Sequence, residues 1–80
     1  MSMPNQQSQR HYSLFIEWSE RDNVYVVSFP EWEQAGHIVH AHGTTYQEAV
    51  ENGQDTLTFL IQATLEEGEN LPEARAYAGV

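Results

Sequence analysis

The sequence contains no cysteine and no lysine, and its only cationic side chains besides histidine are Arg10, Arg21 and Arg75. The absence of cysteine excludes disulfides, thiolate metal sites and thiol nucleophiles. Between Asp22 and Ala74 there is no lysine or arginine at all, so the clustered cations that a phosphate backbone requires are missing from most of the chain. We therefore expect no direct binding of nucleic acid.

Long apolar runs are missing as well. The first ten residues, MSMPNQQSQR, are polar and have the pattern of neither a secretory signal nor a membrane span, so we expect no membrane contact and a cytoplasmic protein. We expect residues 1–10 to be a disordered tail and residues 11–80 to form a single domain, because 80 residues suffice for one small core.

Acidic side chains, in contrast, are abundant. Twelve Asp and Glu residues give the chain a formal net charge of −9. A surface of this charge repels nucleic acids and attracts basic partners, but the same charge also serves solubility alone. Charge by itself therefore leaves two interpretations open, a basic partner or simple solubility.

One long helix is predicted between Gly43 and Pro72. Its apolar or small residues recur at the i, i+3, i+4, i+7 spacing of one helical face. Thr45 and Glu48 have the spacing of a capping box, and Gly68 stands where a left-handed C-terminal stop is needed. The pattern predicts about six turns, on the order of 30 Å in length. The residues of the apolar face are Tyr46, Ala49, Val50, Gly53, Leu57, Leu60, Ile61, Thr64 and Leu65.

Three short strands are predicted ahead of this helix. Residues 11–20 alternate between apolar and polar, residues 24–29 are β-branched or aromatic almost throughout, and residues 37–42 also alternate. A polar turn at 20–23 joins the first two strands as a hairpin, and Pro30 ends the second because it has no N–H to donate.

This β-β-β-α order predicts an α+β domain, in which a three-stranded antiparallel sheet carries one long helix on one face. Residues 73–80 are weakly patterned, and whether they add a fourth strand or fray stays open. Residues 31–36 are interpreted as a loop that exposes Trp32, whereas Trp18 is assigned to the core.

The second strand is apolar on both faces, and one helix covers only one face of a sheet. We place Phe15, Tyr25, Val27 and Phe29 on the uncovered face. Exposed apolar faces of this kind are usually covered by self-association, so we expect these four residues to form the interface of a homodimer or higher homo-oligomer.

No catalytic, metal or cofactor site is expected. His40 and His42 share a face of the predicted third strand, but His37 points elsewhere, so three ligands do not converge, and the role of the histidines stays open. Two-metal nuclease chemistry needs carboxylates that converge on two ions, and Glu17 is the only mid-strand carboxylate of the first two strands. Neither a G-x-S-x-G nucleophile motif nor a phosphate-binding glycine loop is present.

Several short motifs follow one another in a fixed order: YSLFIE at 12–17, YVVSFPE at 25–31, a glycine at 36, GTTYQEAVEN at 43–52, and EG at 67–68 before LP at 71–72. This ordered set resembles the HicB-like antitoxin family, in its N-terminal partial RNase H-like domain. Thr44 departs from the aspartate that the family usually has there. Only eight residues follow Pro72, so the C-terminal DNA-binding module of many members is not expected.

The resemblance implies an antitoxin-type protein, not an enzyme, that binds and masks a small basic HicA-type mRNA interferase toxin. As toxin-binding residues we select Trp32 for apolar contact and Glu48, Glu51 and Asp55 for charge. Two alternatives stay open, an orphan HicB-like interaction module without a toxin and, more distantly, a metal-dependent nuclease.

Overall fold

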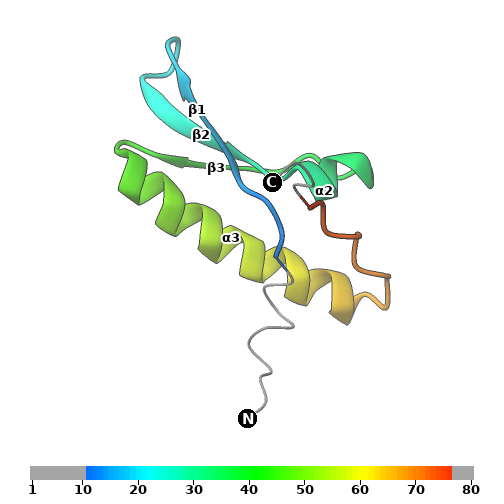
Figure 1. The fold of residues 1–80 in the computed structure, drawn as a ribbon. Helices are drawn as coiled ribbons and strands as arrows, with labels where there is room; N and C mark the ends of the chain where they lie inside the picture. Colours follow the sequence, from blue (N-terminus) through cyan, green and yellow to red (C-terminus); the bar gives the residue numbers. More distant parts are fainter. Residues whose placement is uncertain (1–10, 77–80) are drawn as a thin grey trace.

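Three strands and one long helix follow one another in the expected order. The structure, a computed structural model, describes residues 11–76. Its elements are β1 (Phe15–Ser19), β2 (Val24–Ser28), a short helix α2 (Pro30–Gln34), β3 (His40–Gly43) and α3 (Tyr46–Glu66). The strands form one antiparallel sheet in the order β1-β2-β3, and α3 lies along one face of it (Figure 1). The α+β fold class and the β-β-β-α order are therefore confirmed.

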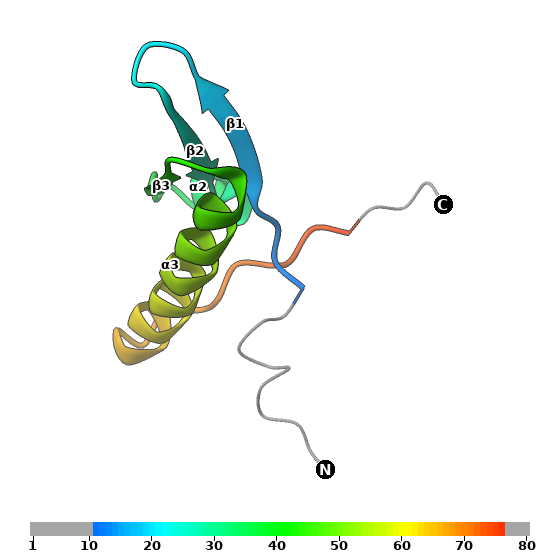
Figure 2. The same ribbon diagram turned by 90° about the vertical axis from the view of Figure 1, so that its left-hand side faces the viewer.

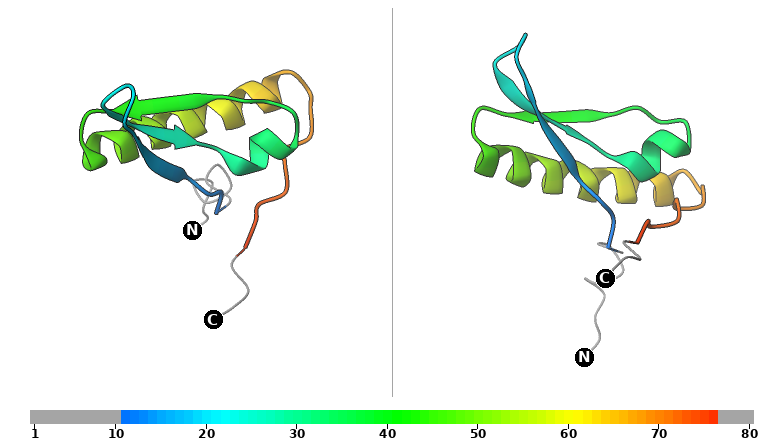
Figure 3. Two further views of the ribbon diagram at one scale, coloured as in Figure 1. Left: turned by 90° about the horizontal axis from the view of Figure 1, so that it is seen from above. Right: turned by 45° about the horizontal axis from the view of Figure 1, so that its top comes forward.

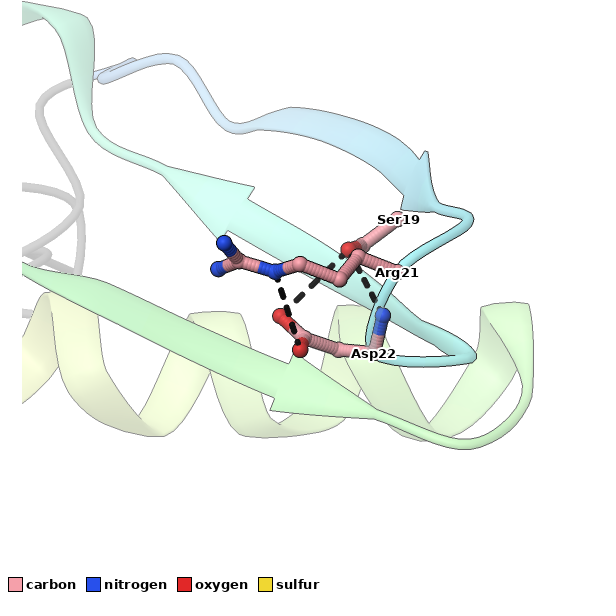
Figure 4. A network of polar contacts seen from close by, with 3 residues as sticks. All are labelled: Ser19, Arg21 and Asp22. Atoms are coloured by element: carbon pink, nitrogen blue, oxygen red, sulfur yellow. Dashed lines mark hydrogen bonds and ion pairs between the residues drawn. The ribbon is translucent and has the colours of Figure 1, made fainter.

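A tight turn joins β1 to β2. Asn23 has a left-handed φ of 61°, which asparagine tolerates better than most residues, and its N–H donates to the Ser19 carbonyl at 2.8 Å. The Ser19 hydroxyl bonds to Asp22, whose carboxylate also lies 3.5 Å from the Arg21 guanidinium (Figure 4). Figures 1 and 2 show this hairpin projecting beyond the adjacent end of α3.

Strand register decides which residues face the helix. Ile16 pairs with Val27, and Val27 pairs with Ala41; directly paired residues point to the same side of a sheet. Val27 and Ala41 are buried, so this side is the inner face, against α3. We call the opposite side the outer face. Its residues are Phe15, Glu17 and Ser19 of β1, Val24, Val26 and Ser28 of β2, and His40 and His42 of β3.

The placement of the four predicted oligomer-interface residues on the uncovered face is therefore mostly wrong. Of these four residues only Phe15, which is 56% exposed, lies on the outer face. Val27 and Phe29 are fully buried in the core, and Tyr25 packs against that core. The physical reason is that β2 is apolar on both faces, so its own sequence does not show which side the helix covers.

The long helix α3 begins and ends at the predicted signals. Thr45 is its N-cap, with the side chain accepting a hydrogen bond from the Glu48 N–H, and Gly68 follows its end with a φ of 76°. The buried positions are Ala49, Gly53, Leu57, Leu60 and Ile61, as the periodicity indicated, although Tyr46 and Leu65 are exposed. At Gly53 the helix approaches the sheet closely, since an added Cβ would lie 3.0 Å from Val27 Cγ1.

The segment between β2 and β3 differs from its prediction. Instead of a loop, residues 30–34 form the helix α2, which has proline in its first turn followed by acidic residues. The third strand is correspondingly shorter and later than expected, beginning at His40 instead of at residue 37. Its alternation is confirmed, because Ala41 is buried while His40 and His42 are exposed.

The segment that follows α3 returns to the start of the domain. The Tyr12 hydroxyl donates to the Pro72 carbonyl, and the Arg75 N–H donates to the Glu31 carboxylate at 3.0 Å. Figure 2 shows residues 71–76 beside the N-terminal side of β1. Residues 73–76 form no strand, and residues 77–80, like the expected disordered tail at 1–10, lie outside the described residues.

Truncation of a core side chain on α3 tests the helix register. We expect Leu60→Ala to lower the free energy of unfolding by about 2–5 kcal/mol, because Leu60 is 8% exposed and its loss leaves a cavity. The adjacent Phe59 is 66% exposed, so Phe59→Ala is the matched control, with an expected cost within about 0.5 kcal/mol. Urea denaturation measures both, and equal costs for the two variants would contradict the register.

Candidate protein-binding surface

Three of the four selected contact residues lie together on the surface. Glu48, Glu51 and Asp55 are exposed in the N-terminal half of α3, where spacings of three and four residues place them along one side of the helix. We call these three residues the acidic stripe. Their carboxylates face away from the core, so they are free to contribute to the field that a partner meets.

Glu48 also has a local role at the helix start. Its carboxylate accepts hydrogen bonds from the Thr44 N–H at 2.6 Å and from the Thr44 hydroxyl at 2.7 Å, while its own N–H donates to Thr45. The side-chain hydrogen bond from Thr44, followed by the backbone one, lowers the pKa of Glu48 from its usual value near 4.5. Thr44 is therefore a hydrogen-bond donor to the cap of α3.

Trp32, the fourth selected residue, is not where the sequence placed it. It is 2% exposed, its indole N–H donates to the Thr64 hydroxyl at 3.3 Å, and its ring packs edge-on against Tyr12 at 4.7 Å. Formation of α2 turns this side chain inward, where a large aromatic surface is stabilised by burial. The placement of Trp32 in an exposed loop is therefore wrong, and it offers no surface for direct apolar contact.

The other tryptophan takes the exposed position. Trp18, which the sequence predicts to lie in the core, is instead 45% exposed and stands near the hairpin end of β1. Its ring meets Tyr25 edge-on at 5.0 Å, and Tyr25 in turn meets Tyr46 at 5.6 Å. We call these three residues the aromatic patch. The aromatic patch connects the hairpin to the first turn of α3, because Tyr46 is the first residue of α3 and precedes Glu48 by two positions.

A buried carboxylate that the sequence did not indicate lies on α2. Glu31 is 2% exposed and accepts hydrogen bonds from the Ser13 N–H and hydroxyl and from the Arg75 N–H, at 3.0 to 3.3 Å. These donors come from both ends of the described chain. Because buried carboxylates need such partners, Glu31 fastens the two ends to α2. The contacts of Glu31 are thus accounted for by its role in holding the chain together.

Cavities near the surface are small and shallow. One of about 250 Å³ is lined by Trp32, Ala35, His37, Thr64, Glu69, Asn70 and Pro72, and one of about 350 Å³ lies between Leu14, Phe15, Pro30 and Arg75. Ligand sites for small molecules typically occupy about 300–1,000 Å³ and have apolar walls with a few convergent polar groups. In the first cavity the Thr64 hydroxyl is already engaged, since it accepts a hydrogen bond from the Trp32 indole and donates one to the Leu60 carbonyl.

The three histidines between α2 and α3 lie in two places. His40 and His42 lie on the outer face, and His37 lines the cavity beside Trp32. Within residues 11–76 no three His, Cys, Asp or Glu side chains stand close enough to hold a metal ion together. Neither described helix is long and apolar enough to cross a membrane. The acidic stripe, the aromatic patch and the outer face are three exposed groups of the described residues that have a capacity for interaction.

Comparison of the chain with protein-family models, with curated proteins and with solved structures found no match.

The cap at Glu48 predicts a specific dependence of stability on pH. A carboxyl whose pKa is lower in the folded state stabilises the fold above its unfolded value near 4.5 and loses that contribution as pH falls through the folded pKa. We expect Glu48→Gln to reduce stability at neutral pH and to flatten the loss of stability below pH 4.5. Glu51→Gln, which removes a carboxylate without the Thr44 hydrogen bonds, is the control for urea denaturation across this range. A pH profile of Glu48→Gln as steep as that of the unmodified chain would contradict the role of the cap.

Proposed function

We propose that this chain is a HicB-like antitoxin-type protein, acting in the cytoplasm, which masks a small basic HicA-type mRNA interferase. The observation that carries the proposal is the acidic stripe next to the aromatic patch, in a chain with no lysine or arginine between Asp22 and Ala74. A protein that cleaves RNA must hold phosphates and therefore presents cations, which an acidic surface attracts.

The mechanism of masking would be occlusion. The acidic stripe would raise the rate of encounter by steering, since exposed carboxylates act mainly on association and are screened by salt. Once the partner has docked, the aromatic patch would supply the apolar contact that slows dissociation, because half-exposed Trp and Tyr are the usual anchors of protein interfaces. Trp18 would therefore take the role that the sequence suggested for Trp32.

The most direct test is protection from a toxin. We expect the chain to restore growth and to stop RNA cleavage when it is co-expressed with the short basic protein of the neighbouring reading frame. RNA cleavage that continues with the chain in excess would contradict the proposal. Absence of any such reading frame, together with no binding to HicA-type toxins, would favour the orphan interaction module.

The kinetics of toxin binding test the division of roles. We expect E51Q/D55N to slow association by about threefold or more at low salt and to flatten its salt dependence, with little change in dissociation. The matched control is E33Q/E73Q, which removes two exposed carboxylates away from α3. Equal effects of the two double variants in stopped-flow or surface-binding measurements would contradict steering by the acidic stripe.

The rate at which the toxin dissociates tests whether the aromatic patch anchors it. We expect Trp18→Ala to speed dissociation at least about tenfold while changing association little. Phe59→Ala is the control, because Phe59 is also an exposed aromatic residue and lies further along α3. Unchanged dissociation for Trp18→Ala, with the far-ultraviolet circular dichroism of the unmodified chain, would exclude the aromatic patch as the anchor.

A further inference from the structure

The outer face of the sheet is organised in complete rows across the three strands. One row consists of Glu17, Val26 and His42, and the next consists of Phe15, Ser28 and His40. Neighbouring strands lie about 4.8 Å apart, so each row places its β1 residue about 10 Å from its β3 residue. The face thus has a carboxylate and a phenyl ring along one edge, two imidazoles along the other, and a central line that includes Val24 and Val26.

No described element covers this face. Figure 1 shows α3 on the opposite side of the sheet, and Figure 3 (left) shows the molecule from above, the side of the sheet away from α3. Phe15 is 56% exposed, and Ile38, just before β3, is 74% exposed. A sheet face in contact with water normally carries polar residues at its centre, whereas here valines occupy two of the three central positions.

We infer that a second copy of the chain covers this outer face, in a symmetric dimer with the two sheets stacked. In this dimer the two-fold axis runs parallel to β2, midway between two sheets that lie about 10 Å apart. Rotation about the axis brings β1 of one copy opposite β3 of the second copy and leaves each residue at the same height along its strand. It places Glu17 of each copy opposite the second copy's His42, and Phe15 opposite the second copy's His40. Both pairs then occur twice, and the valines of β2 meet at the centre.

Charge distribution selects a second copy over a basic protein as the occupant. Glu17 is the only acidic residue among the outer-face residues of the three described strands, so this face offers a basic partner little electrostatic attraction. The acidic stripe lies on α3, across the sheet from this face. Two copies of a chain with net charge −9 therefore meet with their most acidic sides turned apart. This dimer is independent of the proposed toxin and leaves α3 free.

The test is the dimer dissociation constant, measured on the full chain by analytical ultracentrifugation. We expect a dimer at micromolar concentration, and we expect Val26→Glu to raise the dissociation constant at least about tenfold by placing carboxylates at the dry centre. His42→Glu should also weaken the dimer by opposing Glu17 of the second copy with a like charge, and E17R/H42E should restore it. His37→Glu, the same substitution at an exposed histidine away from the outer face, should leave the dimer unchanged.

Three results would overturn the inference. The first is a monomer at about 100 μM, far above the micromolar concentration at which we expect the dimer. The second is a dimer that Val26→Glu leaves intact while circular dichroism shows the fold retained. The third is equal weakening by His42→Glu and His37→Glu, or no restoration in E17R/H42E. Nuclear Overhauser effects between Phe15 and His40 across differently labelled copies would support the stacked arrangement, and their absence in a stable dimer would contradict it.

Discussion

The fold depends on how closely α3 approaches β2 at Gly53. A Cβ added at this position would lie 3.0 Å from Val27 Cγ1 and 3.3 Å from Leu14 Cδ1, so the helix backbone rests almost directly on side chains of the inner face. A second close approach occurs at Gly43, where an added Cβ would collide with the Ala49 backbone nitrogen at 2.3 Å. Together the two glycines allow the backbone of α3 to pack closely against the inner face of the sheet.

That constraint separates the molecule into two surfaces with different chemistry. With Val27 turned toward α3, Val26 is turned away, and it lies between Glu17 and His42 on the outer face. The helix meanwhile directs Glu48, Glu51 and Asp55 into solvent on the other side of the sheet. A basic partner on one side and a second copy on the other are therefore compatible, since neither surface shares residues with the other.

Much of the fold could be predicted from the sequence because its signals are local. The ends of α3 are set by Thr45 and Gly68, and its buried side follows from helical periodicity. The faces of β2 could not be predicted, because a strand that is apolar on both sides satisfies either register until long-range pairing with β1 and β3 decides it. The misplacement of Tyr25 and Val27 has this cause, whereas Phe29 lies just after β2, at the N-cap of α2.

The candidate site was predictable only in part, for a related reason. Exposure of the acidic stripe follows from the same periodicity that identified α3. The exchange of roles between Trp18 and Trp32 depends on tertiary geometry, namely the position of Trp18 near the hairpin end of β1 and the short helix α2. For α2 a local signal did exist, since proline followed by acidic residues is typical of a first helical turn. The burial of Glu31 had no such signal, because its donors come from Ser13 and Arg75, distant in sequence.

The measurement that tests this account most directly is a nuclear Overhauser spectrum of the isotope-labelled chain, read at the α protons of Gly53. We predict strong cross-peaks from these protons to the Val27 methyl groups and to Leu14, and none to Val26. Cross-peaks from Gly53 to Val26 instead of Val27 would mean that α3 covers the opposite face of β2. The outer face and the dimer built on it would then both be contradicted.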